Sequence, residues 1–117
     1  MIEVKRLINL LKKNEIDFFS GVPDSVLKNF SSSLKNNKKH IIATNEGAAV
    51  SIGIGQYLST KKVPVIYMQN SGLSNALNPL ISIAHKKVYS IPLILVIGWR
   101  GSPYLKDEPQ HNVKGKI

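Results

Sequence analysis

The stretch "IIATNEGAAVSIGIG", residues 41–55, contains an apolar run that stops at a carboxylate, after which small side chains follow one another. An acid in the first turn of a helix gains about 0.3–1 kcal/mol from the helix dipole, and this alone could explain Glu46. Gly47, Gly53 and Gly55, however, each cost a helix up to about 1 kcal/mol relative to alanine. We therefore expect a strand to end before Glu46, and we expect another backbone or a flat ligand to approach the helix behind it.

Outward from this stretch, short apolar runs alternate with segments of helical periodicity. The predicted strands are 17–22, 40–45, 63–70 and 91–99, and the predicted helices are 2–14, 24–34, 46–60 and 72–88. This alternation predicts a doubly wound α/β fold with a mainly parallel sheet flanked by helices. The run "PLILVI" has no polar alternation, which is typical of a strand buried on both faces.

Two details of the predicted helices stay open at this stage. Asp24 or Ser25 could cap the helix 24–34. Pro79 either kinks the helix 72–88 or marks a late start. After Trp99 the sequence is polar and shows no further helix, so we expect residues 1–117 to form one partial domain that is truncated at its C-terminal side.

The composition excludes several classes of protein. The chain has 117 residues, of which 43% are hydrophobic, which is enough for one packed core. It has no cysteine, which excludes disulfide scaffolds and thiolate metal sites and fits a reducing cytoplasm. No apolar run approaches the roughly 20 residues that span a bilayer. Residues 1–14 carry charges throughout, unlike a signal peptide. We expect a cytoplasmic protein with no membrane partner.

The net charge is +9, which leaves nucleic-acid binding open as a hypothesis. The lysines lie in scattered pairs at the ends of predicted helices and in loops, which favours a solvated surface, with an anionic ligand as the next interpretation. Nucleic-acid binding is disfavoured, and it predicts an affinity that falls steeply with salt.

The unusual residues gather in the loops that follow the predicted strands, namely 21–25, 44–47, 69–75 and 98–103. In a parallel sheet these loops share one edge, where ligands bind. Asp24, Glu46 and the segment "QNSG" (69–72) are the candidates there. The alternative is structural: Asp24 caps a helix, Ser71 caps the next one, and Gly72 eases the bend. There is no GxGxxG and no Walker A loop to hold phosphates.

Five segments, taken in order, resemble one enzyme family. They are "FFSGVPDSVL", "ATNEGAAV", "YMQNSGLSNALNPL", "VYSIPLILVIGWRG" and "KDEPQH". Together they resemble the N-terminal, pyrimidine-binding domain of phosphonopyruvate decarboxylases, which use thiamine diphosphate. The alpha subunit of sulfopyruvate decarboxylase is a close relative with similar "MQNSGLGN" and "WRG" segments. "GVPDS" and "KDEPQH" favour the phosphonopyruvate enzymes.

The resemblance implies roles for particular residues. Glu46 would hydrogen-bond a ring nitrogen of the aminopyrimidine, and the activated cofactor would act as the electron sink for loss of carbon dioxide from the 2-keto acid. Asp24 and His111 would assist protonation and product release. Asn70, Ser71 and Gly72 would line the pyrimidine or substrate side. We further hypothesise that cationic donors bind the phosphonate. The predicted substrate-binding residues are Asp24, Arg100, Lys106 and Gln110.

The family also implies partners. Its diphosphate-binding domain holds Mg²⁺ and the diphosphate through a GDG-to-Asn motif, and no such segment occurs here, so no metal ligand is expected in this chain. We expect the chain to be inactive without that domain or a separate beta subunit, and to act in a homo-oligomer of at least two copies. The alternatives are a sulfopyruvate decarboxylase alpha subunit and a non-catalytic fragment that acts in subunit association.

Overall fold

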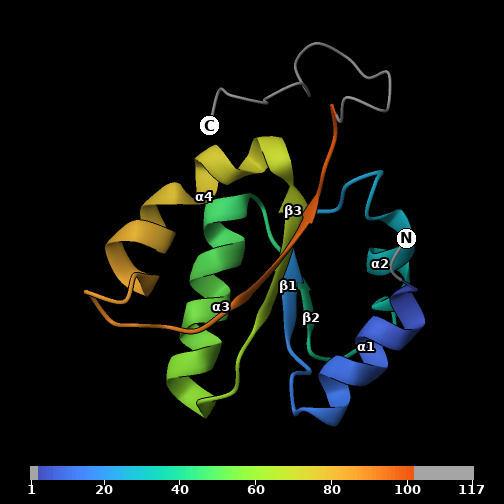
Figure 1. Ribbon diagram of the computed structural model, residues 1–117, viewed down its shortest axis with the longest axis horizontal. Coiled ribbons are helices and arrows are strands. Elements are labelled where there is room, and N and C mark those ends of the chain that lie inside the picture. Colours follow the sequence, from blue (N-terminus) through green and yellow to red (C-terminus); the bar gives the residue numbers. More distant parts are fainter. Residues whose placement is uncertain (1–2, 102–117) are drawn as a thin grey trace.

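The computed structural model describes residues 3–101, which form one parallel four-stranded sheet with helices on both faces (Figure 1). The strands are β1 (Phe19–Gly21), β2 (His40–Ile42), β3 (Val65–Gln69) and β4 (Ile94–Gly98). Their order is β2-β1-β3-β4, and all three neighbouring pairs run parallel. The predicted sheet is confirmed, and the segments that follow the four strands, the last described to Gly101, leave from its carboxyl edge.

The helices divide evenly between the two faces of the sheet (Figure 1). Helices α1 (Val4–Lys13) and α2 (Lys28–Ser33) cover one face, while α3 (Glu46–Thr60) and α4 (Leu73–Pro79) cover the other. This arrangement confirms the doubly wound architecture. Within residues 3–101, no helix has the length and apolar character needed to cross a membrane.

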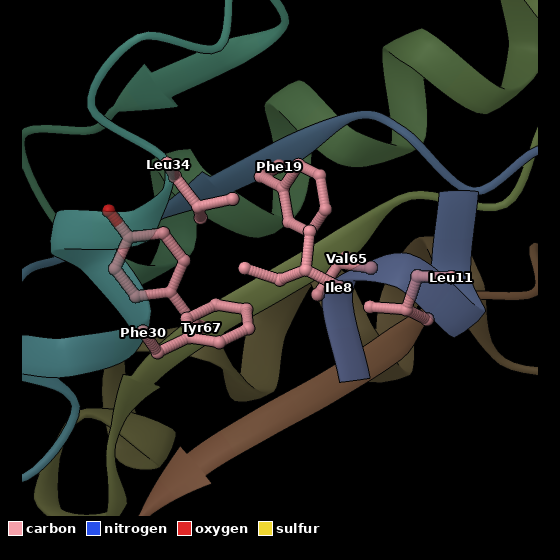
Figure 2. Close-up of a cluster of buried hydrophobic side chains, with 7 residues drawn as sticks. All are labelled: Ile8, Leu11, Phe19, Phe30, Leu34, Val65 and Tyr67. Carbon is pink, nitrogen blue, oxygen red and sulfur yellow. The ribbon is translucent and has the colours of Figure 1, made fainter. Parts of the chain in front are cut away.

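Alternate residues of the central strands supply the two cores. Phe19, Val65 and Tyr67 point to the α1 and α2 side, where the cluster of Figure 2 is completed by Ile8, Leu11, Phe30 and Leu34. The Phe30 ring lies edge-on to both Phe19 and Tyr67, with centroids 6.1 and 5.7 Å apart. On the other face, Ile66 and Met68 pack with the cluster Ala49, Val50, Ile54, Ala76 and Ile91. Because successive side chains of a strand point to opposite faces of the sheet, the same strands contribute residues to both cores.

The outer strands are less buried than their sequences predict. Four residues of β4, Ile94–Ile97, are only half-buried, which corrects the expectation of a strand covered on both faces. Among the described residues β4 is an edge strand, so only one side has a neighbour. Strand β2 forms the opposite edge, and its Ile42 is 64% exposed. The buried strand residues are all of β1, the first four residues of β3 and Gly98 at the end of β4.

Helix α2 begins four residues later than predicted. Its first residue is Lys28, the residue before it is Leu27, and no side chain caps it, so the predicted cap by Asp24 or Ser25 is wrong. The Ser31 and Ser33 hydroxyls bond back to the carbonyls of Lys28 and Asn29, at 3.2 and 2.7 Å. Ahead of the helix, the Asp24 carboxylate accepts from the Val26 N–H and the Lys28 N–H donates to the Ser25 carbonyl, so a turn occupies the residues predicted as its first turn.

Pro79 does not start its helix, which corrects the interpretation of a late start. It is the last residue of α4, and the chain continues as one π-helical turn over Leu80–Ala84. Proline has no N–H to donate to the preceding turn, so a change of hydrogen-bond spacing at this position has a physical cause. The predicted helix 72–88 therefore stops at Ala84.

His40 and Tyr67 form a polar pair at the edge of the first core. The His40 Nε2 atom lies 2.7 Å from the Tyr67 hydroxyl. Burial lowers the pKa of His40 and raises the pKa of Tyr67, so both groups are held in their neutral forms. His40, to which the sequence analysis assigned no role, thus satisfies a tyrosine that belongs to the core.

Two glycines of α3 are expected to respond oppositely to alanine. A Cβ on buried Gly53 would overlap Cδ1 of Ile66 and lie 3.3 Å from Cγ of Pro64, whereas a Cβ on exposed Gly55 meets nothing within 4 Å. We expect Gly55→Ala to stabilise the chain by up to about 1 kcal/mol. Gly53→Ala should destabilise it by about 1–2 kcal/mol, because overpacking outweighs the helix gain. Denaturant midpoints of the two variants check this pair, and equal shifts would contradict it.

Candidate functional site

The candidate site begins at the N-terminus of α3, where Asn45 and Glu46 have separate roles. Asn45 is extended, and its side-chain oxygen accepts a hydrogen bond from the Ala48 N–H at 2.9 Å, so Asn45 is the helix cap. Glu46, the first residue of the helix, is therefore not needed as a cap, and its side chain makes a tertiary contact instead. Asparagine directly before a helical segment is a recognised capping signal, which could have identified Asn45 from the sequence.

The Glu46 side chain contacts Gly72 and Asn75, which lie at the start of α4. The Asn75 amide donates to Glu46 Oε2 at 3.0 Å. On its other side, the carboxylate lies against Gly72, where a Cβ would overlap Oε1 and sit 2.5 Å from Cγ. A Cβ on Gly47 would lie 2.8 Å from the backbone oxygen of Asn75. The small residues predicted to allow a close approach thus allow the starts of α3 and α4 to meet.

Asn70 connects the end of β3 to the end of β4. Its side chain is 1% exposed. Its Nδ2 donates to the Arg100 carbonyl at 3.0 Å, and its Oδ1 accepts from the Arg100 N–H at 3.2 Å. The Asn70 amide therefore binds both the backbone N–H and the backbone carbonyl of one residue in the neighbouring loop. In the described structure Asn70 positions that loop, and its predicted contact with the cofactor stays a prediction.

Asp24 lies at the same edge of the sheet, after β1. Its Oδ2 accepts from the Val26 N–H at 3.1 Å, which shapes the turn before α2. The same oxygen packs over Gly98, the last residue of β4: a Cβ there would lie 2.5 Å from Oδ2 and 2.9 Å from Cγ of Leu27. A second acidic side chain thus rests on a second glycine.

These contacts link all four loops of the carboxyl edge. Glu46 touches the loop after β3, Asn70 joins that loop to the one after β4, and Gly98 receives Asp24 from the loop after β1. The sequence predicted that these loops share an edge, and the structure shows that they contact one another. Sequence reasoning missed Asn75 and Gly98, because a contact between residues 29 positions apart has no periodic signal.

The remaining candidates divide into two groups. The Ser71 hydroxyl accepts from Gln69 Nε2, and no side chain caps α4, so the interpretation of Ser71 as a helix cap is wrong. Lys106, Gln110 and His111 lie outside the described residues. Within residues 3–101, no group of three or more His, Cys, Asp or Glu side chains could hold a metal ion.

The Glu46 carboxylate can accept a further hydrogen bond from a ligand at this edge. Glu46 has one carboxylate oxygen bonded to Asn75, and its Oε1 lies over a glycine. A carboxylate oxygen can still accept a hydrogen bond from a ring N–H, because each oxygen has two lone pairs. The residues present therefore fit a pyrimidine better than a phosphate, for which the described chain supplies neither a glycine-rich loop nor a cluster of cations at this point.

Comparison with known proteins identifies the family of the chain. Residues 4–116 match the family model "Thiamine pyrophosphate enzyme, N-terminal TPP binding domain". The alpha subunit of sulfopyruvate decarboxylase from Methanocaldococcus jannaschii is 39% identical over 97 residues, which are 81% of this chain and 56% of that subunit. Phosphonopyruvate decarboxylase from Streptomyces hygroscopicus is 36% identical over 100 residues, which are 84% of this chain and 24% of that enzyme. The chain thus spans between a quarter and just over half of these relatives.

Solved structures show the same fold. Benzoylformate decarboxylase from Polynucleobacter necessarius superposes with a TM-score of 0.77 at 24% identity, covering 98% of this chain and 22% of that enzyme. The 4-hydroxybenzoylformate decarboxylase of Rhodococcus jostii superposes with a TM-score of 0.71 at 24% identity, covering 83% of this chain and 18% of that enzyme. Because the family model matches residues 4–116, the chain belongs to the thiamine pyrophosphate enzymes and corresponds to their N-terminal, cofactor-binding domain.

Proposed function

We propose that this chain is the pyrimidine-binding part of a thiamine diphosphate-dependent decarboxylase that converts 3-phosphonopyruvate to phosphonoacetaldehyde and carbon dioxide. The single observation that carries the proposal is the Glu46 carboxylate, presented at the joined carboxyl edge of the sheet and held there by Asn75 and Gly72. The names of two relatives, phosphonopyruvate and sulfopyruvate decarboxylase, support the reaction class.

Glu46 would accept a hydrogen bond from the pyrimidine ring and hold a proton at that nitrogen during the reaction. When bound, thiamine diphosphate supplies the electron sink for decarboxylation. Ser71 and Gly72, at the start of the turn beneath Glu46, would line the ring. The diphosphate and its Mg²⁺ would be held by a diphosphate-binding domain or subunit. A second copy of the protein would complete the assembly.

Asp24 is the second acidic group of the proposed mechanism. It lies over the last residue of β4 at the same edge, and together with His111 it would move protons to the reaction product. Arg100, Lys106 and Gln110 would bind the phosphonate, since a dianion is best held by charged and amide donors. Burial of these groups under the partner domain would strengthen each interaction.

Replacing Asp24 with asparagine should lower kcat by about 10²-fold, because an amide cannot transfer the proton. The turn should survive, because the asparagine oxygen can still accept from the Val26 N–H as Asp24 Oδ2 does. Steady-state kinetics of the complete protein, with a thermal midpoint for each variant, check this prediction. A kcat within twofold of wild type would remove Asp24 from the mechanism.

The substrate is tested with the complete protein, meaning this chain together with its diphosphate-binding domain or subunit. Carbon dioxide release is measured with phosphonopyruvate, sulfopyruvate, pyruvate and benzoylformate, in the presence of thiamine diphosphate and Mg²⁺. The highest kcat/KM is expected for phosphonopyruvate. Activity restricted to pyruvate or benzoylformate would contradict a substrate with an anionic side group. No turnover of any 2-keto acid would overturn the decarboxylase proposal and favour a role in subunit association.

Sulfopyruvate is the second candidate substrate, and a specific observation favours it. The sulfopyruvate decarboxylase alpha subunit is 39% identical to this chain over 97 residues and the phosphonopyruvate decarboxylase is 36% identical over 100 residues, so the relatives support sulfopyruvate as closely as phosphonopyruvate. Phosphonate carries up to two negative charges and sulfonate one. A lower KM for sulfopyruvate than for phosphonopyruvate in the same assay would therefore select this alternative.

A further inference from the structure

We propose that Gly72 and Asn75 are positioning residues for the Glu46 carboxylate, Gly72 by leaving it room and Asn75 by binding one of its oxygens. This inference rests on the proposed function, in which Glu46 acts on a thiamine pyrimidine. It adds a second role to Gly72, which would also line the ring in that mechanism, and it assigns a role to Asn75, which was not among the predicted site residues.

The backbone conformation at position 72 does not require a glycine. Its φ is −75° and its ψ is −12°, which is the right-handed helical region that alanine adopts readily, so the interpretation that glycine eases a bend here is wrong. The three atoms nearest to an added Cβ all belong to Glu46: Oε1, Cγ at 2.5 Å and Cδ at 2.6 Å. The absence of a side chain at position 72 is therefore explained by the glutamate that lies over it.

Asn75 fixes the orientation of the Glu46 carboxylate, whereas Gly72 leaves room for it. It is an exposed residue of α4, yet its amide donates to Glu46 Oε2 at 3.0 Å, a hydrogen bond to a charged acceptor. The backbone of Asn75 also lies close to Gly47, so the two helix starts hold each other in register. With Oε2 bound to Asn75, the rotation of the carboxylate is limited, and Oε1 is left for the ligand.

Substitutions at Gly72 and Asn75 are expected to displace the Glu46 carboxylate without unfolding the chain. In Gly72→Ala the new methyl group meets a flexible side chain, which can swing away without strain in the backbone. In Asn75→Leu the donor is lost and the carboxylate can rotate. A misplacement of about 1 Å at a reacting group can cost about 10²-fold in rate. Asn78→Leu is a matched control, because Asn78 is also an exposed asparagine of α4.

The test uses the complete protein with thiamine diphosphate and Mg²⁺. We expect Gly72→Ala and Asn75→Leu to lower kcat by about 10²-fold and to raise the Kd for thiamine diphosphate, measured by calorimetry, by about tenfold or more. Asn78→Leu should leave both values within twofold of wild type. Unchanged Kd and kcat in either test variant would overturn the role of that residue.

A double-mutant cycle separates positioning from a general structural effect. If Gly72 acts through Glu46, then Gly72→Ala should have little further effect in a Glu46→Gln background, within about twofold in kcat. Losses that multiply across the two substitutions would overturn the inference, because they would show a separate role for Gly72.

Crystal structures of the wild type and Gly72→Ala keep this inference distinguishable from the proposed function. If the wild-type complete protein binds no thiamine diphosphate, the proposed function fails. The position of the carboxylate still decides the inference, which requires Glu46 to lose its Asn75 contact in the variant. An unmoved carboxylate over an alanine would overturn it.

Discussion

Replacing Glu46 with glutamine in the complete protein is expected to lower kcat by about 10²–10⁴-fold, the usual contribution of a positioned acid or base. The two side chains have the same shape, and the glutamine oxygen can still accept from Asn75 Nδ2, so the geometry beside Gly72 should persist. What is lost is the negative charge that would hold a proton at the ring nitrogen. The helix itself should lose only about 0.3–1 kcal/mol, because Asn45 remains its cap.

Stopped-flow and steady-state kinetics of the Glu46→Gln protein, together with its thermal midpoint, measure this effect. Glu3→Gln is the matched control, since it makes the same chemical change beside the N-terminus of α1, at an exposed residue. The control should keep wild-type kcat. If Glu46→Gln also kept kcat within fivefold, while still binding the cofactor, Glu46 would not be the proton-holding group and the proposed mechanism would fail.

Replacing Gly21 with alanine is expected to reduce the free energy of unfolding by about 3 kcal/mol or more, the upper end of overpacking costs. Gly21 ends β1 in register with Tyr67 of β3. A Cβ there would overlap the Tyr67 carbonyl oxygen and lie 2.5 Å from its ring carbon Cγ. Tyr67 is fully buried, and its carbonyl accepts the Val22 N–H at 3.1 Å, so neither group can yield without breaking the strand pair.

Urea unfolding of Gly21→Ala, compared with Gly55→Ala, checks this prediction. Both substitutions add one methyl group to a glycine, but position 55 opens to solvent and position 21 faces a neighbouring strand. A loss below about 1 kcal/mol at position 21 would contradict the close approach of β1 and β3. Because the loop with Asp24 leaves β1 at this glycine, activity should fall together with stability.

The course of the chain could be predicted from the sequence because its signals are local. Apolar runs and helical periodicity located the four strands and the helices α1, α3 and α4, and parallel pairing then placed Asp24, Glu46 and Asn70 at one edge. The predictions failed where local signals compete. A turn closed by Asp24 and Ser25 delays the start of α2, and the hydrogen-bond spacing changes after Pro79 at the end of α4. The half-burial of β4 could not be predicted, since it depends on which strands lie beside it.

The sequence by itself determined the fold class, the edge of the sheet that carries the unusual residues, and Glu46 as the residue to explain. Periodicity and strand direction are sufficient for these conclusions, because they depend on neighbours along the chain. Only the tertiary structure decided how the edge is assembled. It showed Asn75 bonded to Glu46, Asn70 bracketing Arg100, and two acidic side chains lying over Gly72 and Gly98. Such contacts join residues far apart in sequence, and strand order and packing alone bring them together.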